Sequence, residues 1–153
     1  MEEFYIANYN SPIGNLVVIS NQQSILECNF QNKKKQSKEI PRILERALKQ
    51  LDEYFKGERR KFDLDLSPSG TEFQEEVWKQ LIEIPFGSTI SYRELAVNVG
   101  NKRAVRAVGN ANGKNPISII IPCHRVIGSD GKLVGYGGGI EKKKWLLDFE
   151  QNQ

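Results

Sequence analysis

Three short runs of β-branched and aromatic residues near the start of the chain predict strands. The three runs are Phe4–Tyr9, Asn15–Ser20 and Ser24–Phe30. Turn residues separate them, as expected for a small antiparallel sheet. After Pro41, apolar residues recur every three to four positions as far as Gly57, which predicts an amphipathic helix. The stretch Asp63–Gly70 ends in Ser, Pro and Gly and predicts a linker.

The rest of the chain shows the apolar spacing and the start signals of helices. Thr71 stands three positions before Gln74, and Ser91 stands three positions before Glu94. A hydroxyl followed at this distance by Gln or Glu is the signature of a capping box at a helix start. A last helix is predicted over Glu141–Glu150. Its inward side chains are expected to be Trp145, Leu146 and Phe149.

A glycine-containing turn at Gly100 separates the helix that begins at Ser91 from a third helix, predicted over residues 102–112. Two short helices joined by a tight turn are typical of a helix-turn-helix. We therefore predict an α+β protein with two domains. Residues 1–66 would form a small antiparallel sheet with a helix, and residues 67–153 a mainly helical domain with a winged helix-turn-helix.

The predicted third helix has one basic side. At about 100° per residue, Val105 and Val108 share a side, which we expect to face the core. The opposite side carries Arg103, Arg106 and Asn110, bordered by Ala107 and Ala111. Between Leu95 and Ser129 the chain has five cations and no Asp or Glu. Such a patch is typical of surfaces that bind phosphate backbones, although a solvated basic face has the same composition.

Length and composition narrow the class of protein. The 153 residues are 39% hydrophobic and 27% charged, with a net charge of +3, which suits one medium domain or two small ones. No apolar run approaches the roughly 18 to 20 residues of a membrane-spanning helix, and the acidic start lacks the pattern of a secretory signal. The two cysteines are expected to be reduced, and with a single histidine they match no zinc site. We therefore expect a cytoplasmic protein without membrane attachment, metal or cofactor.

One of the two cysteines stands directly beside the only histidine. The run Ile117–Ile121 predicts a β-branched strand that Pro122 interrupts, so Cys123 would lie where the strand ends. A neighbouring imidazole is the usual means of forming a thiolate nucleophile near neutral pH. A buried structural cysteine followed by an incidental histidine is an equally good interpretation of the pair alone.

The run Gly135–Gly139 contains four glycines in five residues. Such a run leaves backbone N–H groups accessible to a ligand and tolerates positive φ. The Gly-Lys-Ser/Thr ending of a phosphate-binding P-loop is missing, and a flexible surface loop would have the same composition.

Taken together, the motifs of the second half resemble one family, the O6-alkylguanine-DNA alkyltransferases. The matching segments stand in the family's order and spacing. They are Gly70–Trp78, Ile84–Gly87, Ser91–Ala96, Arg106–Gly109, Asn115–Pro116, Pro122–Val126, Gly135–Gly139 and Trp145–Leu147. The sequence Pro-Cys-His-Arg-Val in that setting is highly specific. The first third of the chain resembles the family only in its length and in its order of strands followed by a helix.

The resemblance implies a catalytic role for each of five residues. Cys123 would take the alkyl group from guanine O6 and become S-alkylcysteine. His124 would act as the base through a bridging water, and Glu150 would orient the imidazole, as in the nucleophile–base–orienter series of a hydrolase. Asn115 would brace the active-site turn. Tyr92 would donate a proton to the leaving base, assisted by backbone N–H groups of the glycine run.

The resemblance also implies double-stranded DNA containing O6-alkylguanine as the partner of a monomeric protein. The damaged nucleotide must leave the duplex, because its O6 atom is inaccessible inside. Tyr92 would rotate the 3′ phosphate, and Arg106 would fill the vacated place in the stack. The helix would lie in the minor groove, unlike that of most helix-turn-helix proteins. The other residues expected at this interface are Lys102, Arg103, Ala104, Ala107, Asn110 and Ala111.

The substrate pocket that the resemblance implies is formed by Gly135, Tyr136, Gly137, Gly138 and Ser118. Gly137 stands where some relatives carry Ser, so only its N–H could contact the substrate oxygen. Ser118 stands where some relatives carry Pro, which leaves the tolerance of bulky adducts open, as is activity on O4-alkylthymine. Arg125 is expected to be structural or to lie near a phosphate.

Three rival functions fit the residues less well. Relatives that only bind alkylated guanine replace the nucleophile, often with Trp, whereas Cys123 is present here. A helix-turn-helix transcription factor would need base-reading side chains, which the alanines of the third helix do not supply. A thiol hydrolase would leave the basic helix unexplained. We therefore expect a DNA repair methyltransferase, a suicide enzyme that restores guanine in one stoichiometric turnover.

Overall fold

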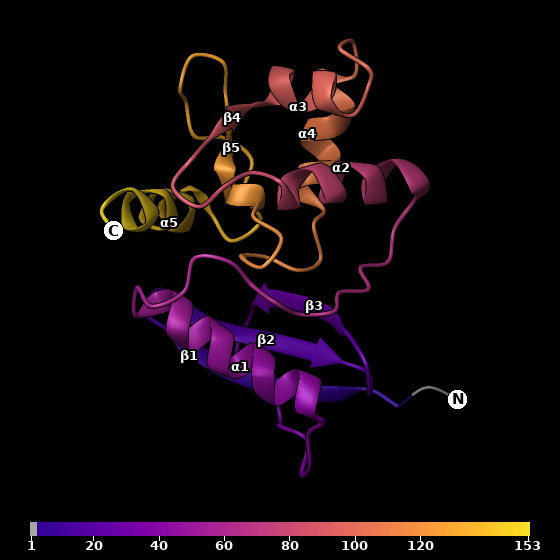
Figure 1. Ribbon diagram of the computed structural model, residues 1–153, viewed down its shortest axis with the longest axis vertical. Coiled ribbons are helices and arrows are strands. Elements are labelled where there is room, and N and C mark those ends of the chain that lie inside the picture. The colour runs from indigo at the N-terminus through magenta and orange to yellow at the C-terminus, as the bar shows by residue number, and fades with distance from the viewer. Residues whose placement is uncertain (1–2) are drawn as a thin grey trace. The chain divides into compact units, whose positions relative to one another are not determined.

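Three antiparallel strands, paired in chain order, begin the fold. In the computed structural model, which describes residues 3–153, β1 spans Tyr5–Ser11, β2 Gly14–Ser20 and β3 Ile25–Phe30. Helix α1 (Arg42–Phe55) lies across one face of this sheet (Figure 1). The strands and the helix thus occupy the predicted places, with ends that differ by one or two residues.

Apolar residues from both sides of this pair fill the first core. Leu16 and Val18 of β2 are completely buried, as are Leu44, Ala47 and Leu51 of α1. The helix positions are spaced by three and four residues, so they form one stripe along α1. The core therefore follows from the apolar pattern.

A distant piece of chain also belongs to this unit. By their contacts, residues up to Ser69 group with Pro116–Ser118, whereas Gly70–Asn115 and Ile119–Gln153 form a second unit. The N–H of Cys28 donates to Pro116 O at 2.9 Å, and the N–H of Ser118 donates to Cys28 O at 2.8 Å. These bonds form an isolated parallel bridge on the outer edge of β3, where a second bridge joins Ile25 to Leu66.

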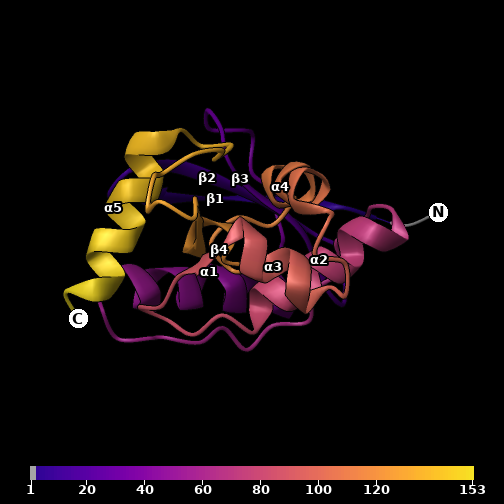
Figure 2. The same cartoon turned by 90° about the horizontal axis from the view of Figure 1, so that it is seen from above.

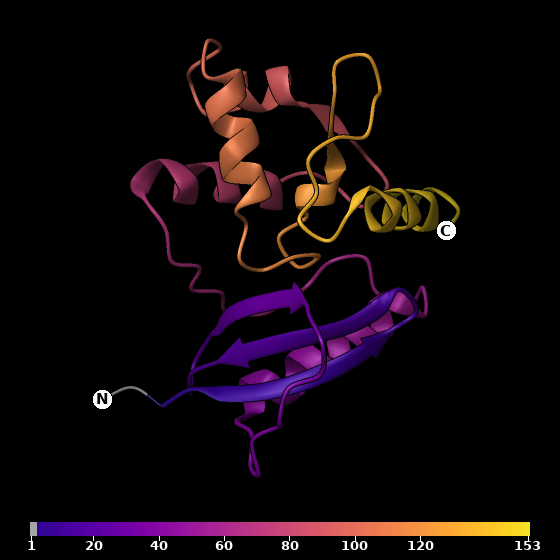
Figure 3. The ribbon, with the colours of Figure 1, turned by 180° about the vertical axis from the view of Figure 1, so that it is seen from behind.

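The second unit is mainly helical. Its helices are α2 (Glu72–Ile82), α3 (Tyr92–Asn98), α4 (Val105–Gly113) and α5 (Ile140–Gln151). Strand β4 (Ile90–Ser91) directly precedes α3, and β5 (Val126–Ile127) directly follows a 3₁₀ turn, η1 (Cys123–Arg125). These two-residue strands pair in parallel. Figure 3 shows α4 standing beside α3, with η1 and β5 between α4 and α5. The α+β fold class is confirmed.

Both predicted capping boxes are present. The hydroxyl of Thr71 accepts from the Gln74 N–H at the start of α2, and that of Ser91 accepts from the Glu94 N–H at the start of α3. In each box the residue at the third helical position bonds back to the backbone of the cap. Because Tyr92 is the first residue of α3, the second box also fixes where that side chain begins.

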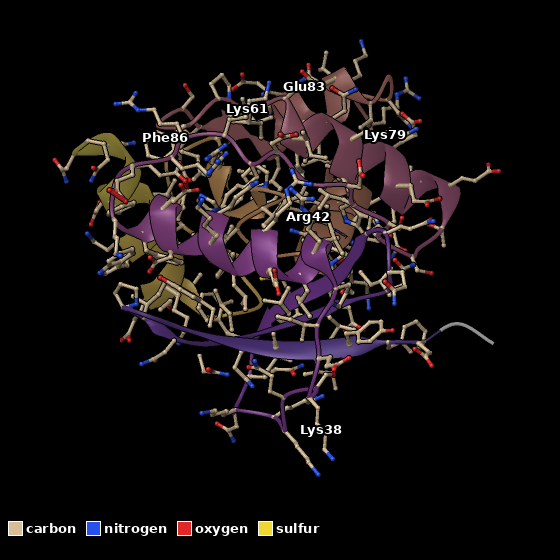
Figure 4. All side chains as sticks on the ribbon, turned by 60° about the horizontal axis from the view of Figure 1, so that its bottom comes forward. Lys38, Arg42, Lys61, Lys79, Glu83 and Phe86 are labelled. Carbon is tan, nitrogen blue, oxygen red and sulfur yellow. The ribbon has the colours of Figure 1, made fainter. Side chains whose placement is uncertain are left out.

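Helix α2 separates a buried face from a polar one. Trp78 is 2% exposed, and its indole N–H donates to Ala111 O in α4 at 2.8 Å. A Cβ on Gly70 would lie 2.5 Å from the Trp78 ring, so only glycine fits there. The side chains of Lys79 and Glu83 are exposed on the polar face, near the C-terminal end of α2 (Figure 4).

The predicted strand over Ile117–Ile121 is wrong. The segment contains isolated bridges and a turn, and Ile119 adopts a left-handed conformation with φ of 72°. A non-glycine residue in this region is uncommon, and it reverses the chain direction. Residues before the turn belong to the first unit, and residues after it belong to the second and lead to Cys123. The apolar side chains of this run are therefore divided between two cores and do not form one strand.

No helix within residues 3–153 is long and apolar enough to span a membrane.

Candidate active site

The cysteine of the Cys-His pair begins the short 3₁₀ turn η1. Cys123 is 5% exposed, and its N–H donates to Ile121 O at 2.8 Å. The amide of Asn115 donates to the same Ile121 carbonyl at 2.7 Å, and the amide of Asn112 donates to Cys123 O at 3.2 Å. Two buried amides at the end of α4 and after it therefore hold the backbone on both sides of the thiol.

The imidazole that follows belongs to a buried charge network. His124 Nε2 lies 2.7 Å from Glu150 Oε2, and both side chains are completely buried. Arg125 donates to both oxygens of Glu150, at 2.8 and 2.9 Å, and to Ile84 O at 2.7 Å. The Gly87 N–H donates to Glu150 Oε1 at 3.2 Å. Helix α5 supplies Glu150 from beside η1 (Figure 2).

These contacts set the protonation states of the network. Burial acts to raise the pKa of Glu150, but hydrogen bonds from His124 and Arg125 outweigh it and hold that pKa well below its usual range. Burial lowers the pKa of His124, against the opposing pull of Glu150. The carboxylate is therefore ionised and the imidazole neutral at pH 7, and Nε2 carries the proton that it donates to Glu150.

The other imidazole nitrogen is left as the basic one. Within the described part of the chain, His124 Nδ1 has no hydrogen-bond partner and is buried. Burial raises the pKa of the Cys123 thiol, although a hydrogen bond from Asn115 and the charge of Lys143 oppose part of the rise. The thiol thus needs a base to ionise, and an imidazole with a free lone pair follows it directly in the chain.

A second polar cluster surrounds the phenol of Tyr92. Its hydroxyl donates to Val134 O at 2.8 Å. Lys143 Nζ donates to the same carbonyl at 2.7 Å and to the Tyr92 hydroxyl oxygen at 3.4 Å. Burial raises the pKa of Tyr92. A Cβ on Gly135, whose φ is +66°, would lie 3.3 Å from the phenol oxygen, so the glycine lets the chain pass close by.

The exposed side of α4 matches the expected DNA-facing residues in part. Arg106, Ala107 and Asn110 are exposed on the helix, and Ala104 is half-buried at its N-cap. Lys102 and Arg103 are exposed but precede the helix, which begins at Val105. The predicted start at residue 102 is therefore three residues early.

Two residues of the predicted third helix face the other way. Ala111 is only 2% exposed, because it lies one turn from the buried Val108 on the same side. Its expected place on the groove-facing side is contradicted. Val105, expected in the core, is 37% exposed.

The glycine run contributes backbone more than side chains. Gly135 and Gly139 have φ of +66° and +102°. Gly137 is exposed, Gly138 half-buried and Tyr136 buried. Ser118, also expected in the pocket, belongs by its contacts to the N-terminal unit. The pocket that these residues would form stays a prediction.

The sequence assigned no catalytic role to three polar residues that lie in the site. Asn112 is buried against Cys123, and Arg125 proves structural through its paired bonds to Glu150. Lys143 is completely buried on α5, whereas Trp145 and Phe149, expected inside, are half-buried and stack on each other. Apolar periodicity assigns a lysine to the solvent side, so nothing in the sequence pointed to Lys143. Arg125 lies within the Pro-Cys-His-Arg-Val motif and was expected to be structural or to lie near a phosphate.

The second unit thus combines a buried thiol, an imidazole–carboxylate pair and exposed cations on and just before α4, a combination typical of a cysteine-dependent protein that acts on nucleic acid. Two family models match this chain. The 6-O-methylguanine DNA methyltransferase DNA binding domain matches residues 72–152. The ribonuclease-like domain of the same methyltransferase matches residues 4–68.

Individual relatives match over nearly the whole chain. A methylated-DNA–protein-cysteine methyltransferase of Methanosarcina barkeri is 50% identical over 149 residues, covering 93% of this chain and 94% of that protein. The O6-methylguanine methyltransferase of Mycobacterium tuberculosis superposes with a TM-score of 0.89 at 42% identity, over 98% of this chain and 94% of that one. The same organism's OGT in complex with DNA gives 0.87 at 45% identity, over 95% and 91%. The chain therefore belongs to the 6-O-methylguanine DNA methyltransferase family.

Proposed function

We propose that this chain repairs DNA by moving the alkyl group of O6-alkylguanine irreversibly to its own Cys123. The observation that carries the proposal is the buried network of His124, Glu150 and Arg125 directly after the thiol. Membership of the methyltransferase family supports the reaction class, and the DNA-bound structural relative supports DNA as the partner.

The first step is ionisation of the thiol. His124 Nδ1 accepts the Cys123 proton through a bridging water, since the nitrogen is basic and has no hydrogen-bond partner among residues 3–153. The imidazolium that forms is stabilised by Glu150, which accepts from Nε2 at 2.7 Å. Arg125 keeps this carboxylate ionised and in place. The proton then passes from the imidazolium to water.

The second step is an in-line displacement. The Cys123 thiolate forms a bond to the alkyl carbon, the bond from that carbon to O6 breaks, and its electron pair enters the guanine ring. Tyr92 gives its phenolic proton to the base, so guanine leaves neutral. The N–H of Gly137 would stabilise the charge that develops at O6. Removing the alkyl group from the neutral thioether would require the Cys123 thiolate to depart as a poor leaving group, so the protein reacts once.

DNA binding would use the exposed side of α4. Arg106, Ala107 and Asn110 lie on that side, where small side chains allow close approach to the minor groove. Arg106 would occupy the place of the flipped nucleotide, and Tyr92 at the start of α3 would crowd its 3′ phosphate.

The reaction itself needs only one copy of the protein for each lesion, so we propose that the protein acts as a monomer. Both cysteines are unpaired, which suits the reducing cytoplasm.

Mass spectrometry tests this function directly. Purified protein is mixed with duplex DNA containing O6-methylguanine, and peptides bearing Cys123 and Cys28 are compared. One methyl group should appear on Cys123 and none on Cys28, with repair ending at one equivalent. Cys123→Ser should abolish transfer, whereas Cys28→Ala is the matched control and should keep it. Repeated turnover, or transfer by Cys123→Ser, would contradict the proposal. A duplex with O4-methylthymine shows whether that base is also repaired.

A further inference from the structure

The loop between α2 and β4 contacts both members of the buried ion pair. Arg125 Nη1 donates to Ile84 O at 2.7 Å, and the Gly87 N–H donates to Glu150 Oε1 at 3.2 Å. The Phe86 ring also covers the guanidinium, whose carbon lies 5.7 Å from the ring centroid. The three contacting residues of the loop carry no charge. They therefore supply a carbonyl and an aromatic face to the cation and an N–H to the carboxylate.

A β-turn aims the glycine N–H at the carboxylate. The Ser88 N–H donates to Pro85 O at 3.0 Å, which closes a four-residue turn. Gly87, its third residue, has φ of +81°, whereas the φ of Phe86, its second, is not positive. This combination is that of a type II turn, which favours glycine at the third position. In a type I turn the central peptide is reversed, so the Gly87 N–H would point away from Glu150.

The carboxylate needs contacts from outside its own helix to keep its place. Glu150 is the last residue but one of α5, and the ends of helices fray. We propose that the turn Pro85–Ser88 is a positioning element of the reaction, which keeps the Glu150 carboxylate against the His124 imidazole. Gly87 is the positioning residue within this turn. The inference rests on the proposed function, in which His124 is the base.

The turn acts on the imidazole through the charge of the carboxylate. The charged groups that act on His124 are Arg125 of η1 and Glu150 and Lys143 of α5, and the Cys123 thiol precedes it in the chain. Burial lowers the pKa of His124, and Glu150 opposes this fall. A carboxylate that loses a donor becomes a stronger acceptor, so loss of the Gly87 bond should raise the pKa of His124. A loop that only packed against the helix would affect stability without moving this pKa.

The backbone preference of residue 87 allows a graded test. Gly87→Ala disfavours the positive φ and with it the type II turn, whereas Gly87→Asn tolerates it. A Cβ at this position would lie 3.5 Å from Glu150 O, an ordinary van der Waals contact, so the Cβ itself does not separate the two variants. Gly57→Ala is the matched control, because Gly57 has φ of +77° and belongs to the N-terminal unit.

The four proteins are compared by two measurements, without a histidine tag. Because His124 is the only histidine, NMR signals of the imidazole follow its titration alone, from about pH 5 to about pH 9. Alkylation of Cys123 by free O6-benzylguanine, which needs no base flipping, gives the rate over the same range. Gly87→Asn and Gly57→Ala should titrate and react like the wild type. Gly87→Ala should titrate at higher pH and react about 10-fold more slowly, a fraction of what a general base contributes.

Three results would each overturn the proposal. The first is a Gly87→Ala protein whose imidazole titrates like that of the wild type. The second is a Gly87→Asn protein that reacts as slowly as Gly87→Ala, because the turn type would then be irrelevant. The third is an equal shift of the His124 titration in Gly57→Ala, because backbone strain anywhere in the chain would then suffice.

Phe86→Leu provides a second test if thermal melting shows that Gly87→Ala does not fold. Loss of the ring admits water to the network and screens Arg125, so both the burial and the cation that lower the pKa of His124 weaken. The imidazole should again titrate at higher pH, and an unchanged titration refutes the proposal. The titration uses neither DNA nor an alkyl donor. Failure of the wild type to methylate Cys123 on alkylated DNA would therefore overturn the proposed function separately.

Discussion

At the scale of single residues, hydrogen bonds fix the protonation state of each group in the His124–Glu150–Arg125 network. Glu150 accepts hydrogen bonds from both His124 and Arg125. Moving the carboxylate away from the imidazole would therefore leave the buried guanidinium without its ion-pair partner. That pairing fixes the His124 tautomer, which in turn leaves Nδ1 as the basic nitrogen. The sequence motif Cys-His-Arg therefore contains the proposed nucleophile, its proposed base and the residue that anchors Glu150, the partner of that base.

Because His124 is the only histidine, stability between about pH 7.5 and about pH 5.5 reports on it. Its folded pKa lies below the unfolded value of about 6.5. The unfolded chain therefore binds an extra proton below that value. The free energy of unfolding then falls as the pH is lowered, by up to about 1.4 kcal/mol per pH unit. Urea unfolding across this interval measures the slope. His124→Asn should flatten it, and a flat wild-type curve would contradict the buried neutral imidazole.

Removing the guanidinium should cost more than removing an exposed one. Arg125→Met leaves the carboxylate of Glu150 buried with half of its partners, which typically costs about 3 to 5 kcal/mol. Arg103→Met, an exposed control, should change the free energy of unfolding by less than about 0.5 kcal/mol. Urea unfolding of both variants at pH 7 checks this. Equal stabilities would mean that the Arg125–Glu150 pair does not hold the site.

At the scale of elements, the sequence predicted best where a local signal decides the structure. The capping boxes at Thr71 and Ser91 form as predicted because their partners lie three residues away. The run Ile117–Ile121 looks like a strand locally, but its two ends belong to different units. Lys143 was missed because its charge implies solvent, whereas its environment comes from α3 and the segment before α5. Long-range partners of this kind leave no local pattern.

The two capping boxes allow a matched comparison. Ser91→Ala and Thr71→Ala each remove one cap, which costs about 0.5 to 2 kcal/mol of stability. Ser91 also places Tyr92, the first residue of α3, so Ser91→Ala should slow methyl transfer as well. Thr71→Ala should lower the melting temperature and leave the rate of transfer unchanged. If both variants react like the wild type, the start of α3 does not position Tyr92.

Helix α4 should matter for duplex DNA more than for a free base. Arg106→Ala removes the exposed side chain that we assign to the vacated stack, so repair of duplex O6-methylguanine should slow by about 10-fold or more, equivalent to about 1.4 kcal/mol. Reaction with free O6-benzylguanine needs no flipping and should be unaffected. Lys79→Ala on α2 is the control for loss of one exposed charge. Equal losses on the two substrates would contradict the flipping role.

At the scale of the whole molecule, each of the two units contains one thiol, and the two thiols differ in their surroundings. Cys28 is completely buried in the sheet core, where burial raises the pKa of its thiol to about 12. Cys123 is also buried, but amides, a base and a cation surround it. Burial is therefore common to both thiols, and the polar groups around the sulfur make the difference.

Alkylation of the native protein should reveal this difference. Iodoacetamide should label Cys123 and leave Cys28 unmodified until the chain is unfolded in denaturant, because a thiol with a pKa of about 12 is protonated at pH 8. Prior incubation with methylated DNA should block native labelling completely, since the thioether at Cys123 is no longer a nucleophile. Peptide mass spectra report both sites in one measurement. Native labelling of Cys28 at a rate equal to that of Cys123 would show that the surroundings of Cys123 do not activate it.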